Sequence, residues 1–135
     1  MADRTVFLDT SGLFAWVNAR DPHHQAMLAL PRTEGTRLVL TDYVVDEACA
    51  LFLVRGIAHR RKDLLRLIKH SKIVSFFWVE REIFWEAWDI LERFADQPFS
   101  LTDCPSFAVM RKLRITEAAT NDQHFRTAGF VPLLG

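Results

Sequence analysis

Four acidic residues occupy comparable positions in the sequence, although they are far apart along the chain. Asp9 directly follows the short apolar run TVFL, and Asp122 directly follows the short run EAATN. Glu47 and Asp103 each fall in the first turns of a predicted helix. Carboxylates at the ends of neighbouring elements can meet in a fold, and together they can bind a divalent cation.

A divalent cation would also explain why these charges are kept. Asp103 lies in SLTDCPSFAVM among apolar residues, where an unpaired carboxylate is costly. Carboxylates that share a site repel one another and raise each other's pKa, and helix N-termini compensate only in part. Oxygen ligands with no Cys and few His favour Mg²⁺ or Mn²⁺ as the ion.

Each acid also has a purely structural interpretation. Asp9 precedes a predicted helix and would cap it, and Asp103 would favour the dipole of its own helix. Asp122 in TNDQHF would be an ordinary loop acid. The helix around Glu47 is apolar on nearly all sides, so Asp46 is an alternative inward-facing acid. The matching placement of all four acids favours a shared site.

The elements that would position these acids alternate between two periodicities. Short strand-like runs are predicted at residues 5–9, 37–41, 72–79, 116–121 and 130–134. Helical patterns are predicted at residues 11–19, 23–30, 43–56, 60–70, 81–95 and 100–113. The second of these helices is expected to stop near Pro31, and the third at Gly56. Thr102 is expected to be the N-cap of the last helix. This alternation predicts a parallel sheet with helices on both faces and a ligand site at the carboxyl ends of the strands.

Length and composition limit the class of protein. The 135 residues suit one domain, expected over residues 1–135, and half of them are hydrophobic. Lys plus Arg and Asp plus Glu each number 17, so bulk positive charge does not drive nucleic-acid binding. Cys49 and Cys104 fit no metal-ligand pattern and are expected to be buried free thiols. With no signal-peptide pattern and no membrane-spanning run, a soluble cytoplasmic protein is expected.

The stretches around the four acids resemble the successive motifs of PIN-domain ribonucleases, and most of all the VapC-type toxins of toxin–antitoxin pairs. These stretches are FLDTSGLFA, TDYVVDEACALF, SLTDCPSFAVMRKLRI and AATNDQHFRTAGF. The resemblance implies a three-layer α/β/α domain around a parallel sheet of four to five strands. It also implies Mg²⁺- or Mn²⁺-dependent endonuclease activity on RNA, a homodimer, and neutralisation by a small antitoxin.

The resemblance also assigns roles to individual residues. The acidic quartet corresponds to Asp9, Glu47, Asp103 and Asp122, and the supporting polar positions to Ser11 and Thr120. Asn121 fills a position that is often apolar or aromatic in relatives. As a hypothesis, Asp9 and Asp103 are central metal ligands and Glu47 orients or deprotonates the attacking water. Asp122 would complete the outer coordination.

Further residues are candidates for contacts with substrate or partners. His124 and Arg126 lie beside Asp122 and would meet RNA. Arg60 and Arg61 belong to a basic stretch that would contact phosphates, with a solvated helix face as the alternative. The aromatic residues between 76 and 94, with the apolar helix near Phe52 and Leu53, are expected to contribute to a surface for a second protomer or the antitoxin.

Two other functions are consistent with the same pattern. One is a housekeeping RNA-processing nuclease of the same fold. The other is a non-catalytic metal-binding or interaction domain, which the complete acid set disfavours. A phosphotransferase with an acid nucleophile would need a second Asp two residues after Asp9, where Ser11 stands.

Overall fold

The computed structural model describes residues 4–135, so residues 1–3 of the expected domain lie outside the described part of the chain. The elements are β1 (Arg4–Leu8), α1 (Thr10–Val17), α2 (His24–Arg32), β2 (Thr36–Thr41), α3 (Asp42–Val54), the 3-10 helix η1 (Ala58–Arg60), α4 (Arg61–His70), β3 (Val74–Phe77), α5 (Arg81–Arg93), α6 (Asp103–Leu113), β4 (Glu117–Ala119), α7 (Gln123–Thr127) and β5 (Val131–Pro132). None of the helices in residues 4–135 has the length and apolar character needed to cross a membrane.

All strand pairs of the central sheet are parallel. The strand order is β3-β2-β1-β4-β5, which confirms the predicted parallel sheet with five strands. The chain builds outward from β1 to β3 and then returns to the other side of β1, where β4 pairs with it. Ligands of such sheets bind where the strand order reverses, beyond the carboxyl ends of the strands. Here that point lies between β1 and β4.

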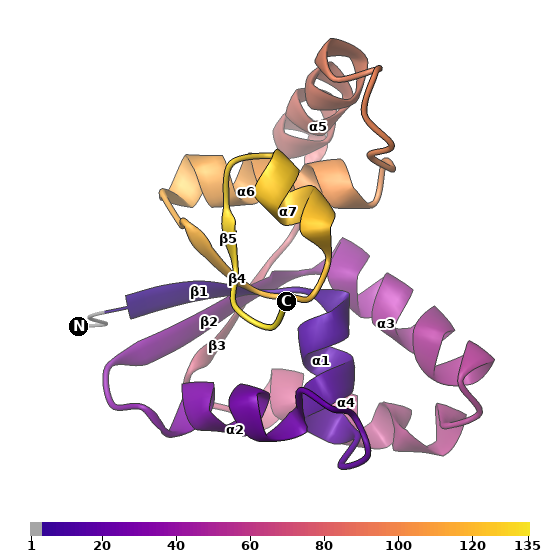
Figure 1. Ribbon diagram of the computed structural model, residues 1–135, viewed down its shortest axis with the longest axis vertical. Coiled ribbons are helices and arrows are strands. Elements are labelled where there is room, and N and C mark those ends of the chain that lie inside the picture. The colour runs from indigo at the N-terminus through magenta and orange to yellow at the C-terminus, as the bar shows by residue number, and fades with distance from the viewer. Residues whose placement is uncertain (1–3) are drawn as a thin grey trace.

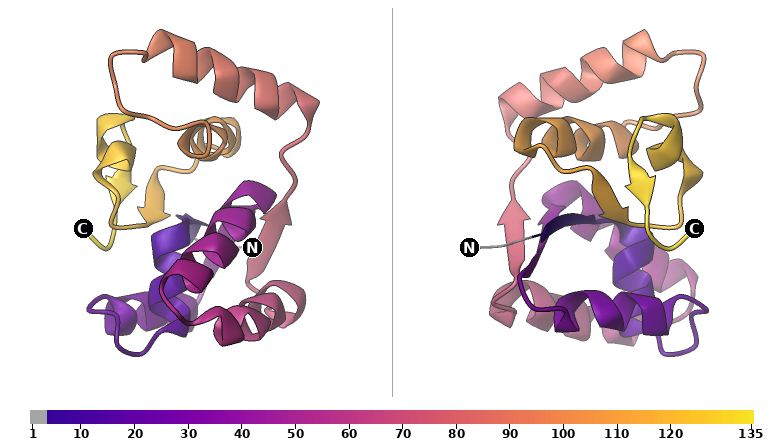
Figure 2. Two further views of the ribbon diagram at one scale, coloured as in Figure 1. Left: turned by 90° about the vertical axis from the view of Figure 1, so that its right-hand side faces the viewer. Right: turned by 60° about the vertical axis from the view of Figure 1, so that its left-hand side comes forward.

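Helices cover both faces of the sheet, which confirms the predicted three-layer α/β/α arrangement. One face carries α1 to α4, and the other carries α6 and α7 (Figure 1). Helix α5 lies outside α6 and is separated from the sheet by it (Figure 2). As a result, α6 is enclosed between the sheet and another helix, and its residues from Cys104 to Met110 are all buried.

The central strands form the core together with α6. Val6, Phe7 and Leu8 of β1 are fully buried, and so are Leu38 and Leu40 of β2. Burial on both faces is what a central parallel strand requires, and it explains why these runs are continuous rather than alternating in hydrophobicity. Asp9 directly follows β1, so it is attached to the end of a fully buried strand.

A glycine brings α1 unusually close to the sheet. A Cβ added to Gly12 would lie 2.3 Å from the backbone oxygen of Ala119 and 3.0 Å from a methyl carbon of Leu8. Only glycine permits this approach of helix to strand. The approach places the start of α1 against the end of β4, so residues that are more than 100 positions apart in sequence become neighbours.

Several predicted boundaries differ from the structure. The strands predicted at residues 72–79 and 130–134 are shorter, and the helix Gln123–Thr127 was not predicted. Helix α2 ends at Arg32, one residue after Pro31, so the helix stop expected near Pro31 is confirmed. The Thr102 side chain makes no cap; the Ser100 hydroxyl accepts from the backbone N–H of Asp103 instead, at 3.1 Å.

Candidate active site

A polar cavity lies at the carboxyl ends of β1 and β4. Its volume is about 470 Å³. Its lining comes from α1, α3, the loop after α1 and the segment after β4, and consists of Asp9, Thr10, Ser11, Phe14, Asp21, Glu47, Leu51, Arg55, Asn121, Asp122 and Gln123. Three of the four predicted acids therefore share one cavity.

The hydroxyl groups of Thr120 and Ser11 form hydrogen bonds that connect Asp9 with the backbone of Asn121 and Asp122. The Thr120 hydroxyl donates to Asp9 Oδ2 at 2.8 Å and accepts from the backbone N–H of Asp122 at 3.0 Å. Since its single proton is used on Asp9, the Ser11 hydroxyl must be the donor in the 3.1 Å contact with Thr120. Ser11 in turn accepts from the backbone N–H of Asn121 at 3.0 Å. Every partner in this network is satisfied, which fixes the position of the acids.

Glu47, rather than Asp46, faces the cavity. Helix α3 begins directly after β2, and its Thr41 cap accepts from the backbone N–H of Val44 at 3.3 Å. This register leaves Asp46 exposed and turns Glu47 inward, where Thr10 donates to its Oε1 at 2.5 Å. The alternative that the sequence left open is thereby resolved.

Asp9 is destabilised as a charged group. Its pKa is raised to about 7, chiefly by burial and to a lesser extent by the negative charges of Glu47 and Asp122, while hydrogen bonds from Thr120 and the backbone N–H of Thr10 act in the opposite direction. A shift of this size corresponds to about 4 kcal/mol of penalty on the charged form. A cation beside Asp9 would remove that penalty, so the electrostatics of the cavity suit a bound metal ion.

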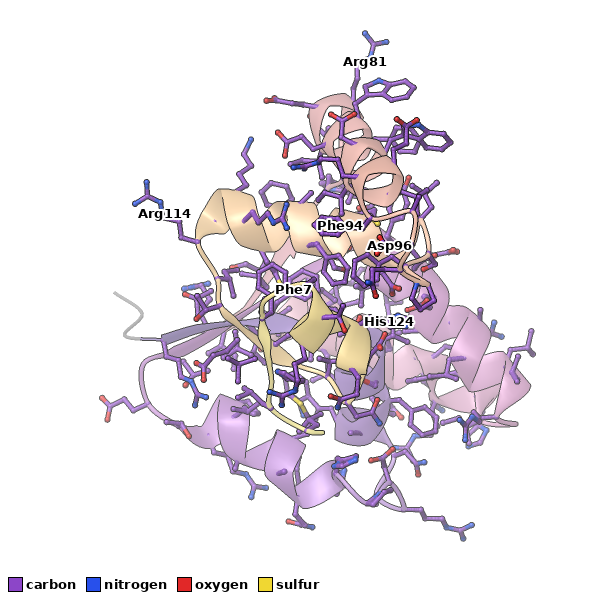
Figure 3. All side chains as sticks on the ribbon, turned by 45° about the horizontal axis from the view of Figure 1, so that its top comes forward. Phe7, Arg81, Phe94, Asp96, Arg114 and His124 are labelled. Atoms are coloured by element: carbon purple, nitrogen blue, oxygen red, sulfur yellow. The ribbon has the colours of Figure 1, made fainter. Side chains whose placement is uncertain are left out.

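Asp103 joins the site through Asp122 and His124. It is the first residue of α6, and its Oδ2 lies 3.1 Å from His124 Nδ1. The same nitrogen lies 3.6 Å from Asp122 Oδ1, and one ligand atom from each of the three residues falls within 4.8 Å of the others. His124 is located near the start of α6, whereas Arg114 marks the opposite end (Figure 3). Asp122 thus connects Asp9 and Glu47 with Asp103.

The donor set fits a hard divalent ion. Asp9, Glu47, Asp103 and Asp122 offer carboxylate oxygens, the ligands that Mg²⁺ and Mn²⁺ prefer. Cys104 adjoins Asp103, but burial raises the pKa of its thiol to about 11, and the charge of Asp103 contributes to the shift. Cys104 is also fully buried and is not among the residues that line the cavity, so it is not counted among the ligands.

The structure brings only some of the basic candidates to this cavity. Arg126 donates to Gln123 Oε1 at 3.3 Å, and because Gln123 lines the cavity, Arg126 lies beside the cavity. Arg60 instead lines a separate groove, pairs with Asp63 at 2.6 Å and donates to the Val17 carbonyl at 2.8 Å. Arg61 donates to the carbonyl of Ala58, at 3.0 Å. Neither of these two arginines is among the residues that line the acidic cavity.

Sequence reasoning missed several residues of the cavity. Thr10 positions Glu47, and Asp21 adds a carboxylate from the loop after α1. Arg55 is the C-cap of α3 and lies eight residues after Glu47. Its guanidinium is 5.7 Å from the centroid of the Phe14 ring. The position of Arg55 two turns after Glu47 was a usable signal, whereas no local pattern indicated Asp21.

An aromatic face is formed by β3, the residue after it and α5. We define it as Phe76, Trp78, Phe84, Trp85 and Trp88; the ring of Phe76 contacts that of Trp78, and the ring of Phe84 contacts those of Trp85 and Trp88. Trp78 is 64% exposed and Trp85 is 56% exposed, and both line a hollow of about 790 Å³. On α3, the side chain of Leu53 is exposed whereas that of Phe52 is fully buried, so Leu53 is the one of these two residues that is available at the surface expected to meet a partner.

Comparison with known proteins places this geometry in a wider group. A model of the PIN domain matches residues 6–131. The 23S rRNA-specific endonuclease VapC20 of Mycobacterium tuberculosis is 33% identical over 126 residues, which cover 93% of this chain and 95% of that protein.

Solved structures show the same fold. The crystal structure of Mycobacterium tuberculosis VapC20, a toxin that cleaves the sarcin–ricin loop, superposes with a TM-score of 0.83 at 30% identity, over 93% of this chain and 96% of that one. VapBC2 from Rickettsia felis, bound to a DNA fragment from its promoter, has a TM-score of 0.66 at 11% identity, with 95% and 96% covered. FitAcB from Neisseria gonorrhoeae has a TM-score of 0.62 at 14% identity, with 94% of each chain covered.

Proposed function

The chain is a member of the PIN-domain family, and we propose that it is a divalent-metal-dependent endoribonuclease of the VapC type that hydrolyses RNA at its acidic cavity. The observation that carries the proposal is the convergence of Asp9, Glu47 and Asp122 on one cavity, with Asp103 joined to it through Asp122 and His124. Without a cation, the negative charges of these carboxylates repel one another. With a divalent cation, the same carboxylates would form a metal site that can activate water for phosphodiester hydrolysis.

Each acid has a role that its surroundings support. A bound divalent ion lowers the pKa of water and neutralises charge on phosphoryl oxygens. Asp9 and Asp103 would hold Mg²⁺ or Mn²⁺, and Asp122 would complete the ligand set. Glu47, kept in place by Thr10, would orient the attacking water and accept its proton as the oxygen–phosphorus bond forms. The bond from phosphorus to one ribose oxygen then breaks, and that oxygen takes up a proton.

Ser11 and Thr120 act as positioning residues in this proposal. Neither would touch the substrate; they keep the segment after β4 against the start of α1, so that Asp122 stays near Asp9. Asn121 takes part through its backbone N–H, which any residue type except proline could supply at that position. This explains how a polar side chain is tolerated there.

The identity with VapC20 supports a substrate class. That relative is a 23S rRNA-specific endonuclease, and we propose ribosomal RNA, with its sarcin–ricin loop as the first candidate, as the substrate of this chain. His124 and Arg126 lie beside the acids and would meet the RNA there. We assign no such contact to Arg60 or Arg61 at the cavity, because Arg60 lines a different groove and Arg61 donates to the Ala58 carbonyl instead.

The same relative supports a role as the toxin of a toxin–antitoxin pair. We propose that a cognate antitoxin and a second copy of the chain are its protein partners, and that the aromatic face and the exposed end of α3 contribute to these contacts. Growth arrest on expression, relieved by co-expression of the small protein encoded next to it, would separate this role from housekeeping RNA processing.

A cleavage assay tests the proposed activity. Wild-type protein, Asp9→Asn and the control Asp96→Asn are incubated with a sarcin–ricin loop RNA and with total ribosomal RNA, in Mg²⁺, in Mn²⁺ and in chelator. Asp96 is exposed and outside the cavity. We expect cleavage by the wild type and Asp96→Asn only when an ion is present, and none by Asp9→Asn. Full activity of Asp9→Asn would refute the site.

A further inference from the structure

We propose that His124 is itself a ligand of the divalent ion, through Nδ1, and that this nitrogen makes the site prefer Mn²⁺ and Co²⁺ over Mg²⁺. The inference rests on the proposed function, because it concerns the same carboxylates. It adds a nitrogen to a ligand set that otherwise consists of oxygen atoms. It also gives His124 a role distinct from contact with RNA.

The spacing of three ligand atoms carries the proposal. Nδ1 of His124 lies 3.1 Å from Asp103 Oδ2 and 3.6 Å from Asp122 Oδ1, and all three residues offer an atom within 4.8 Å of the others. Two ligand atoms at right angles and about 2.1 Å from one ion lie about 3.0 Å apart, and opposed ones about 4.2 Å apart. The two distances from Nδ1 fall within this range, and the carboxylate oxygens of Asp103 and Asp122 lie within 4.8 Å of each other, so a small movement of one carboxylate would let all three atoms share an ion.

The imidazole is held in this orientation from two sides. Asp122 Oδ1 accepts from the backbone N–H of His124 at 2.9 Å, which fixes the first turn of α7. The buried ring of Phe99 meets the imidazole edge to face, with the ring centroids 5.7 Å apart. The side chain of His124 is 34% exposed, so one edge remains open while Nδ1 faces the acids.

This orientation serves a metal ion better than it serves a simple ion pair. With the proton on Nε2, the lone pair of Nδ1 points at the space that Asp103 and Asp122 also face. Without an ion, a proton on Nδ1 would be donated to Asp103 Oδ2, because a carboxylate can only accept. The same contact therefore keeps the ring ready for an ion, and only a bound ion uses all three groups at once.

A nitrogen ligand changes which ions bind best. Mg²⁺ favours oxygen ligands and gives up its water reluctantly, whereas imidazole binds first-row transition ions with an affinity that rises from Mn²⁺ to Co²⁺. A site of carboxylates alone would discriminate less among these ions. The expected order of affinity at this site is Co²⁺ above Mn²⁺ above Mg²⁺.

Two measurements on the full chain test the assignment. Calorimetry gives the affinities for Mg²⁺, Mn²⁺ and Co²⁺, and electron spin echo modulation of the Mn²⁺-loaded protein reports a directly bound ¹⁴N. The variants are His124→Asn, which removes the ring, His124→Asp, which offers an oxygen instead, and the control His59→Asn. His59 is exposed and does not line the acidic cavity.

We expect ¹⁴N modulation in the wild type and in His59→Asn, and its loss in both His124 variants. His124→Asn should weaken Mn²⁺ and Co²⁺ binding about tenfold or more, and Mg²⁺ binding less than about threefold. His124→Asp should bind all three ions, with the preference for Mn²⁺ over Mg²⁺ reduced. These results would support the ligand assignment.

The contrary results are equally distinct. A wild type without ¹⁴N modulation, or an equal loss for all three ions in His124→Asn, would show that His124 only orients the carboxylates. Nitrogen coupling without cleavage of any RNA would support the ligand and overturn the nuclease alone. A wild type that binds none of the three ions would overturn both.

Discussion

The hydroxyl of Thr120 donates a hydrogen bond of 2.8 Å to Asp9, and so ties the segment after β4 to the end of β1. The two residues are 111 positions apart in sequence. Their contact lies at the place where the strand order of the sheet reverses, between β1 and β4. Most of the acidic site depends on this contact, because Thr120 also accepts from the backbone of Asp122.

Replacing Thr120 by Val should therefore disturb two acids at once. The variant loses the donor to Asp9 and the acceptor for the Asp122 N–H, so we expect a loss of about 1–2 kcal/mol in unfolding free energy and at least about a tenfold lower kcat. Thr120→Ser keeps the hydroxyl and should recover most of the activity. Urea denaturation and RNA cleavage measure the two effects; equal losses in the Val and Ser variants would contradict the role of the hydroxyl.

Asp9→Asn should stabilise the metal-free protein at alkaline pH. Burial raises the pKa of Asp9 to about 7 in the fold, so between about pH 4 and pH 7 the folded state binds more protons than the unfolded state. The contribution of Asp9 to stability therefore falls as pH rises through this window. We expect Asp9→Asn to be about 1–3 kcal/mol more stable than wild type at pH 8 without metal, and about equal at pH 4.

The same pair of proteins should respond oppositely to metal. Saturating Mn²⁺ should raise the melting temperature of the wild type at pH 8 and leave that of Asp9→Asn nearly unchanged, because binding to the folded state is stabilising. Thermal unfolding at pH 4 and pH 8, with chelator or with Mn²⁺, measures both effects. A wild type whose metal-free stability rises from pH 4 to pH 8 relative to the variant would contradict the raised pKa.

Gly12→Ala should destabilise the fold strongly. The new Cβ would lie 2.3 Å from the Ala119 carbonyl oxygen, so α1 would have to move away from β4. We expect a loss of more than about 2 kcal/mol and a matching loss of activity, since α1 carries Ser11. Gly56→Ala is the control: nothing lies within 4 Å of its added Cβ, and its φ of +74° should cost only about 1 kcal/mol. A smaller loss at Gly12 than at Gly56 would rule out the close approach.

Glu47→Gln and Asp46→Asn should separate the two neighbouring acids of α3. Glu47 lines the cavity and accepts from Thr10, whereas Asp46 is exposed. Loss of a group that accepts a proton lowers kcat by about 10²–10⁴-fold, so we expect this of Glu47→Gln and no change in Asp46→Asn. Single-turnover cleavage measures the chemical step, and a comparable loss in both variants would contradict the register of α3.

The acids were predictable from the sequence because each one lies at or near the end of a recognisable element. Asp9 follows β1 and Asp122 comes three residues after β4, and these two neighbouring strands of a parallel sheet end at a common edge. Topology alone was therefore enough to predict that these side chains meet. The resemblance to PIN-domain ribonucleases then added the role of each acid.

Other features depend on contacts that no local pattern contains. The choice between Asp46 and Glu47 follows from the Thr41 cap, which sets the rotation of α3. The burial of residues 104–110 of α6 on all sides depends on α5, which lies outside α6 (Figure 2). The proximity of His124 to Asp103 requires α7, a helix of five residues that is too short to show a period. Asp21 reaches the cavity from a loop, where periodicity gives no information.

The location of a bound ion tests the central claim most directly. Crystals of wild type and Asp9→Asn, soaked in Mn²⁺ and measured at the manganese absorption edge, would show the ion by its anomalous scattering. We expect the strongest peak among the carboxylates of Asp9, Asp103 and Asp122, and no peak there in Asp9→Asn. A strongest peak remote from these residues, or an equal peak in both crystals, would contradict the account.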